Sequence, residues 1–103
     1  LGCATALLYC KRASVLLELG RPRAAARDCT AALDANPDSG KAYRIRARAR
    51  LAKSLFSPQE LEMLLSAQAD YRQSLAIDDD EATAAEAREV DARVRELQAR
   101  AEA

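Results

Sequence analysis

Apolar residues recur along most of the chain at the three- and four-residue spacing of amphipathic helices. Short polar, glycine- or proline-containing segments interrupt this pattern. It predicts five helices, at about 4–19, 22–35, 40–55, 57–77 and 81–101. In the first of these, Leu8, Leu16 and Leu19 are expected among the packed positions. A chain of this pattern favours close-packed helices over sheets.

The residues between the predicted helices support these boundaries. Gly20 permits a left-handed end for the first helix, and Pro22 suits the first turn of the second. Pro37 cannot continue the second helix. Ser57, followed by a proline and a glutamate, is expected to cap the fourth helix. The acidic run 78–81 is expected to cap the last helix, because carboxylates complement the positive end of a helix dipole.

The sequence contains an internal repeat. One set of residues recurs after 34 positions: Tyr9, Arg12 and Ala13 recur as Tyr43, Arg46 and Ala47. A second set recurs after 42 positions: Ala25, Asp28 and Leu33 recur as Ala67, Asp70 and Leu75. A period of 34 residues is that of the tetratricopeptide repeat (TPR), a pair of antiparallel helices. The difference between the two offsets indicates an insertion of eight residues inside the second unit.

The repeat predicts one all-α domain over residues 1–103, built from TPR-type antiparallel helix pairs as a fragment of a right-handed α-solenoid. A first unit is expected at 6–39 and a second at 40–79, with a C-terminal capping helix at 80–103. The insertion is expected to lengthen one or both helices of the second unit by about two turns. The first residue is not methionine, so we expect the chain to be cut from a longer protein.

The last predicted helix carries a narrow apolar seam on otherwise charged faces. The seam consists of Ala87, Val90, Val94, Leu97 and Ala101. Such a seam is typical of a helix that packs on the last repeat and shields its open end from water. A coiled-coil dimer is the alternative interpretation, although the seam is short and rich in alanine.

The composition excludes several kinds of active site. The chain has no histidine, no glycine-rich phosphate loop and no nucleophile motif, so no enzymatic activity is expected. Its cysteines, Cys3, Cys10 and Cys29, are odd in number and form no Cys-x-x-Cys pair. We expect buried or half-buried thiols in a reducing cytoplasm, without disulfide, zinc or other cofactor. The acidic run 78–81 is alternatively a metal site, but it lacks the glycine and twelve-residue loop of an EF-hand.

Charge is unevenly distributed along the chain. Residues 1–53 carry 11 Lys/Arg and 4 Asp/Glu, whereas residues 54–103 carry 5 and 12, although the whole chain is neutral. The asymmetry favours an acidic partner for the first half. Neutral net charge and only 4% aromatic residues argue against nucleic acid. No apolar run reaches the roughly 20 residues that span a membrane.

Four basic residues are the candidate binding site. Lys41, Arg44 and Arg48 share one face of the third helix, which should face the groove of a TPR unit. Lys11 holds the equivalent place on the first helix. These four residues form what we call the basic strip, which is suited to carboxylates. The alternative is that these four residues are ordinary solvated charges. The remaining arginines of the third helix, Arg46 and Arg50, are expected to be solvated or to cover neighbouring apolar surface.

The segment 6–38 resembles one TPR unit, through its Tyr…Ala…Gly…Ala…Leu…Asn-Pro spacing. A closer resemblance is to the TPR region of the Hip family of co-chaperones. It rests on three segments: Leu8-Tyr-Cys-Lys-Arg-Ala-Ser-Val15, Arg27-Asp-Cys29 and Asn36-Pro-Asp-Ser39. The likeness is strong over residues 5–50, weak through the insertion and loose around 70–90. It implies that the first repeat of that family is missing, and we expect the exposed apolar end at residues 1–20 to reduce solubility or cause self-association.

The resemblance implies a co-chaperone module that binds the nucleotide-binding domain of the seventy-kilodalton heat-shock chaperone and stabilises its ADP state in the cytoplasm. The alternative is a generic TPR scaffold, or a co-chaperone that grips the chaperone's C-terminal Glu-Glu-Val-Asp tail. By resemblance, the tail clamp requires asparagine, lysine and arginine where this chain has Lys11, Lys41 and Ile45. Only the lysine is kept, and a missing arginine removes a contact of about 1.5–3 kcal/mol, which disfavours tail binding.

Overall fold

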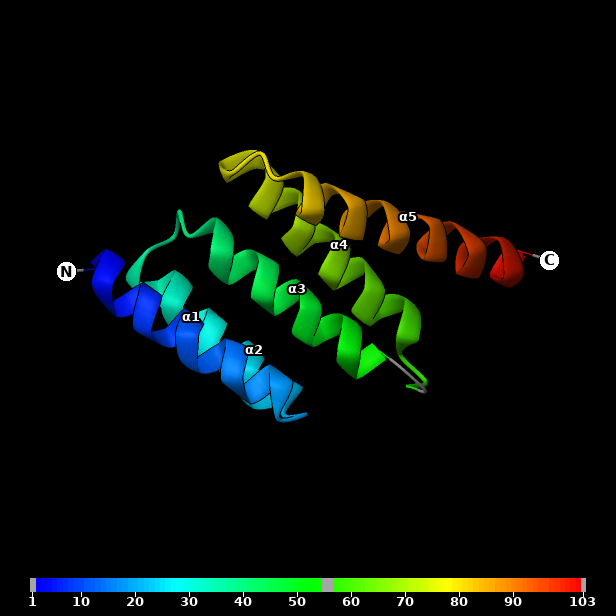
Figure 1. The fold of residues 1–103 in the computed structure, drawn as a ribbon. Coiled ribbons are helices and arrows are strands. Elements are labelled where there is room, and N and C mark those ends of the chain that lie inside the picture. Colours follow the sequence, from blue (N-terminus) through cyan, green and yellow to red (C-terminus); the bar gives the residue numbers. More distant parts are fainter. Residues whose placement is uncertain (1, 55–56, 103) are drawn as a thin grey trace.

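The computed structural model describes residues 2–54 and 57–102, which form helices and no strand. The helices are α1 (Gly2–Glu18), α2 (Pro22–Ala35), α3 (Gly40–Ser54), α4 (Glu60–Ile77) and α5 (Glu81–Glu102). Each helix packs against the one before it, and α1 also contacts α3 (Figure 1). This arrangement confirms the all-α, TPR-like fold. No helix in the described part of the chain is long and apolar enough to cross a bilayer.

The end of α1 and the start of α2 follow the sequence signals. Gly20 has a φ of 76°, a left-handed conformation that glycine adopts without steric cost. Its N–H donates to the carbonyl of Leu17 at 3.0 Å, and the N–H of Arg21 donates to Leu16 at 2.9 Å. These two bonds form a Schellman motif, which satisfies carbonyls at the end of α1. Pro22 then opens α2, whose observed bounds equal the predicted ones.

The second helix pair differs from the prediction at its turn. The hydroxyl of Ser57 accepts the N–H of Gln59 at 3.1 Å, which closes a turn before the helix instead of capping it, and α4 begins at Glu60. Ala25 of α2 and Ala67 of α4 are equivalent in the repeat and so give a common reference point. α2 begins three residues before Ala25, whereas α4 begins seven residues before Ala67. The insertion therefore lengthens α4 by about one turn. The predicted end of the third helix, Leu55, lies outside the described residues.

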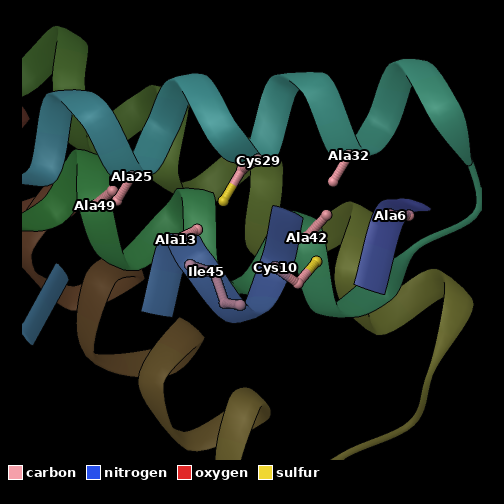
Figure 2. Close-up of a cluster of buried hydrophobic side chains, with 9 residues drawn as sticks. All are labelled: Ala6, Cys10, Ala13, Ala25, Cys29, Ala32, Ala42, Ile45 and Ala49. Atoms are coloured by element: carbon pink, nitrogen blue, oxygen red, sulfur yellow. The ribbon is translucent and has the colours of Figure 1, made fainter. Parts of the chain in front are cut away.

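A first core of small residues joins α1, α2 and α3 (Figure 2). It consists of Ala6, Cys10, Ala13, Ala25, Cys29, Ala32, Ala42, Ile45 and Ala49. Alanines at six of these nine positions let the three helix backbones approach closely. Burial raises the pKa of Cys29 to about 12, so its thiol stays protonated and unreactive. Cys3, which was expected to be at least half-buried, is exposed.

A second core lies between α3, α4 and α5. Its buried members are Ala47, Leu64, Ala67, Tyr71, Val90 and Val94. The predicted seam of α5 thus packs on the preceding helix pair, except for its last member, Ala101, which is exposed. Polar contacts add to this packing: Gln68 donates to Asp91 at 2.6 Å. A coiled-coil dimer through the same seam would have to break the second core.

The residues that recur in the sequence form the same ion pair in both helix pairs. Arg12 makes two hydrogen bonds to Asp28, each 2.7 Å long, and Arg46 makes two to Asp70, at 3.0 and 2.9 Å. Asp70 also accepts a bond from Arg50 at 2.8 Å. We expected Arg46 and Arg50 to be solvated or to cover apolar surface, and their pairing with a buried carboxylate on α4 was not anticipated.

One side of α1 is apolar and uncovered by any described helix. Leu8 is 68% exposed and Leu19 is 65% exposed, so the prediction that they pack was wrong, whereas Leu16 is half-buried. The position on α3 that corresponds to Leu8 is Ala42, which is fully buried in the first core beside α1 and α2. Within the described residues, α1 has no such neighbour on that side, which agrees with the expected apolar end.

Candidate functional site: a groove beside α1, α3 and α5

Two hollows on the surface adjoin each other at Arg48. The first, of about 230 Å³, lies between α1 and α3 and is lined by Ser14, Leu17, Glu18, Ile45 and Arg48. The second, of about 530 Å³, is lined by Arg48, Leu51, Ala52, Ser54, Glu60, Leu64 and Arg93, from α3, α4 and α5. We call the two hollows together the groove. Five of its lining residues are apolar and four are charged, a mixture that is common on surfaces that bind another chain.

The two lysines of the basic strip are open to solvent. Lys11 and Lys41 are both exposed. Within the described residues, neither forms an ion pair with a carboxylate. Their ammonium groups are therefore free to meet an acidic surface without first breaking a contact within the domain.

Arg48 is held by α5. It makes two hydrogen bonds to Glu86, at 2.8 and 2.7 Å, and the hydroxyl of Tyr71 donates to the same carboxylate at 3.2 Å. The hydrogen bonds from Arg48 hold the pKa of Glu86 below its usual value, and the same bonds raise the pKa of Arg48. Burial raises the pKa of Tyr71, so its hydroxyl remains a donor. The two-bond geometry is the strongest form of arginine–carboxylate contact.

Arg44 also faces α5 rather than open solvent. Its guanidinium lies 4.0 Å from a carboxylate oxygen of Asp80. Asp80 in turn accepts the backbone N–H of Thr83 at 2.9 Å, which caps α5 as predicted for this acidic run. Hydrogen bonds from Thr83 lower the pKa of Asp80, so it is ionised at neutral pH. The structure thus divides the basic strip into two open lysines and two arginines that face carboxylates of α5.

Glu86 is the residue of this site that sequence reasoning missed. The opposite charges of the two halves of the chain were a signal for it, because they allow the basic α3 to pair with the acidic α5 inside one domain. Ile45 is 3% exposed in the first core and lines the groove without offering any polar group. Within residues 2–54 and 57–102, no group of three or more acidic or cysteine side chains is placed to hold a metal ion.

The pair between Arg48 and Glu86 predicts an acid-sensitive attachment of α5. Glu86→Gln is expected to lower the free energy of unfolding by about 1 kcal/mol at pH 7, since both groups are partly exposed. The folded state lowers the pKa of Glu86 below 4.5, so its contribution is complete above that pH and disappears as the pH falls through the lowered pKa. Urea titrations of both proteins at several pH values would measure the difference, and a difference unchanged down to pH 3 would contradict this origin.

Comparison with known proteins places the domain among TPR proteins. No protein-family model matches the sequence. The chain is 40% identical over 78 residues to Hsc70-interacting protein 1 of Drosophila melanogaster, covering 76% of this chain and 19% of that protein. It is 34% identical over 71 residues to the TPR repeat-containing thioredoxin TDX of Arabidopsis thaliana, covering 69% and 19%. It is 48% identical over 76 residues to a 58 kDa phosphoprotein of Plasmodium berghei, covering 72% and 18%. The chain spans about a fifth of the length of these relatives.

Proposed function

We propose a function for this chain on the premise that it is a TPR-like protein-interaction domain, similar to that of the Hsc70-interacting proteins. The proposal is that it binds the nucleotide-binding domain of the seventy-kilodalton heat-shock chaperone and stabilises the ADP-bound state. The observation that carries it is the 40% identity to two Drosophila proteins whose name states that they interact with Hsc70. A cytoplasmic location remains a prediction that follows from this partner.

The basic strip is the proposed contact surface, with unequal roles for its members. Lys11 and Lys41 are open and would meet acidic side chains of the partner directly. Arg48 is paired with Glu86 of α5 and Arg44 lies 4.0 Å from Asp80, so their charges are less available to a partner than those of the lysines. We therefore expect the lysines to supply most of the electrostatic attraction, and the apolar lining of the groove to supply buried area.

The proposed mechanism is a population shift. A protein that binds one conformation of its partner more tightly than another raises the population of that conformation. If this domain prefers the ADP-bound nucleotide-binding domain, ADP leaves more slowly in its presence. The domain's own residues carry out no chemical step in this scheme, which requires no cofactor and no enzymatic activity.

The alternative function is a TPR scaffold, or a module that binds the chaperone's Glu-Glu-Val-Asp tail. The open position of Lys41 favours a carboxylate ligand of some kind. Against tail binding, Ile45 is buried in the first core and has no group that donates a hydrogen bond. The two ligands, nucleotide-binding domain and tail peptide, distinguish the two functions.

Reversing the charge of both open lysines is expected to abolish most of the effect on ADP. The double variant Lys11→Glu/Lys41→Glu should weaken binding by about tenfold or more, because two attractive contacts become repulsive. Release of a fluorescent ADP analogue from the chaperone's nucleotide-binding domain, followed in a stopped-flow instrument, measures this. Arg72→Glu, on the exposed surface of α4 away from both hollows, is the matched control. If the double variant slows release of the ADP analogue as much as the unchanged chain does, the proposed role of the lysines is refuted.

The uncovered side of α1 is proposed to cause self-association of this chain. Leu8, Val15 and Leu19 lie along this side and are each more than half exposed. Burial of such side chains against a second copy contributes about 25 cal/mol per Å² of apolar area. Light scattering at increasing concentration should show dimers that Leu8→Gln/Leu19→Gln removes and Leu65→Gln, on exposed α4 surface, does not. A monomer at every concentration would overturn this.

A further inference from the structure

We propose a second binding site, for a phosphate group on a protein, in a basic pocket between α2 and α3. The pocket has a volume of about 380 Å³ and is lined by Arg23, Ala26, Arg27, Thr30 and Lys53. Three of these five side chains are cations, and none is a carboxylate. Within the described residues, none of the three cations forms an ion pair. We call this hollow the α2–α3 pocket.

The arrangement of these cations is unfavourable for the domain alone. Arg23 and Arg27 are four residues apart on α2, where two like charges repel each other. Arg23 also lies in the first turn of α2, next to the positive end of the helix dipole, and α2 has no acidic residue there. Lys53 adds a third positive charge from the end of α3. An anion in the pocket would offset the repulsion among these positive charges.

The internal repeat shows that this cluster is not part of the shared scaffold. The residues that hold each helix pair together recur 42 positions later, as Asp28 does in Asp70. Arg23 and Arg27 do not recur, because the same offset leads to Leu65 and Ala69. The fold therefore forms without such cations in the second pair, and the first pair carries them in addition to what packing requires.

The ligand is identified from charge and hydrogen-bonding capacity. Thr30 is already engaged, since its hydroxyl donates to the carbonyl of Ala26 at 3.1 Å and accepts from Arg46 at 3.3 Å. The ligand must then be held by Arg23, Arg27 and Lys53 alone, which are donors without acceptors. A phosphorylated serine or threonine carries a charge of about −1.5 to −2 and three acceptor oxygens, and so matches three cations better than one carboxylate does.

The α2–α3 pocket is separate from the groove. Lys53 is five residues from Arg48, a spacing that places the two side chains on different faces of α3. No residue lines both the pocket and either hollow of the groove. A partner could therefore occupy the groove and place a phosphorylated segment in the pocket, and the two sites can be tested independently.

The test is an NMR titration of this chain with inorganic phosphate, followed by an acetylated and amidated Gly-phosphoserine-Gly peptide. Shifts are expected at the side-chain N–H groups of Arg23 and Arg27 and at the backbone amides around Lys53. The double variant Arg23→Gln/Arg27→Gln should weaken binding of both probes by about tenfold or more, since it removes two charge-assisted contacts. Arg72→Gln serves as the matched control, and circular dichroism confirms that each variant folds.

The other possible outcomes of the titration either support the proposal or overturn it. Equal binding by the double variant and the unchanged chain would mean non-specific attraction and overturn the site, as would the absence of any shift. Equal affinity for a Gly-Glu-Gly peptide would overturn the choice of phosphate. Tighter binding of a short oligouridylate, lost in the same double variant, would overturn a protein source and indicate RNA. Specific binding of the phosphopeptide, lost only in the double variant, supports the proposal.

Discussion

Replacing Tyr71 with alanine should lower the free energy of unfolding by about 3–5 kcal/mol, the range for removing a large buried aromatic side chain. Among the described residues Tyr71 is the largest fully buried side chain, with 0% of its surface exposed, and it belongs to the second core. Its removal leaves a cavity between α3, α4 and α5, because the backbone relaxes only in part. It also removes the hydroxyl that donates to Glu86.

Urea denaturation followed by circular dichroism measures this loss. Tyr71→Phe is the matched control, because it keeps the ring and removes only the hydroxyl; it should cost about 1 kcal/mol. A loss below about 1 kcal/mol for Tyr71→Ala would contradict the central place of this side chain. Equal losses for the two variants would mean that the hydrogen bond, and not the packing, stabilises α5.

Replacing Asp70 with alanine should destabilise the domain by about 2–4 kcal/mol. The side chain of Asp70 is 4% exposed and binds both Arg46 and Arg50. Removal of one partner from a buried pair costs about 3–5 kcal/mol, since it leaves charge buried without compensation. Arg50 is 32% exposed and regains water more readily, so a loss near or slightly below the lower end of that range is expected.

The repeat supplies the control for this prediction. Asp28→Ala removes the equivalent carboxylate of the first helix pair, but its partner Arg12 is 65% exposed and can return to water. We expect a loss of about 1 kcal/mol for that variant, from denaturation under the same conditions. The reverse order, with Asp28 more costly than Asp70, would show that burial of the arginines does not set the strength of these pairs.

Local signals were sufficient to predict much of the fold. The bounds of α2 were predicted to the residue, because Pro22 and Pro37 restrict the backbone directly and need no tertiary contact. The repeat offsets also identified Arg46 and Asp70 as recurring residues. That the two form an ion pair was not predicted, since the offsets show which residues recur but not which of them meet.

The predictions that failed concern features that depend on contacts between distant segments. Leu8 and Leu19 have helical spacing, which cannot distinguish a core face from one that no neighbouring helix covers. Ser57 has the residue type of a helix cap, yet a local turn uses its hydroxyl instead. The basic strip was identified from α1 and α3 alone. Which of its members are open and which face carboxylates depends on where α5 lies, so this could not be predicted. Glu86 lies 38 residues from Arg48, beyond any local pattern.

The proposed function is tested most directly by calorimetry with two ligands, the ADP-bound nucleotide-binding domain of the seventy-kilodalton chaperone and a Glu-Glu-Val-Asp peptide. The proposal predicts that the chain binds the nucleotide-binding domain but not the peptide. It also predicts that this binding weakens with added salt and with Lys11→Glu/Lys41→Glu. Binding of the peptide alone would contradict it and favour the tail-binding alternative. Binding of neither ligand would also contradict it and leave a TPR scaffold with a different partner.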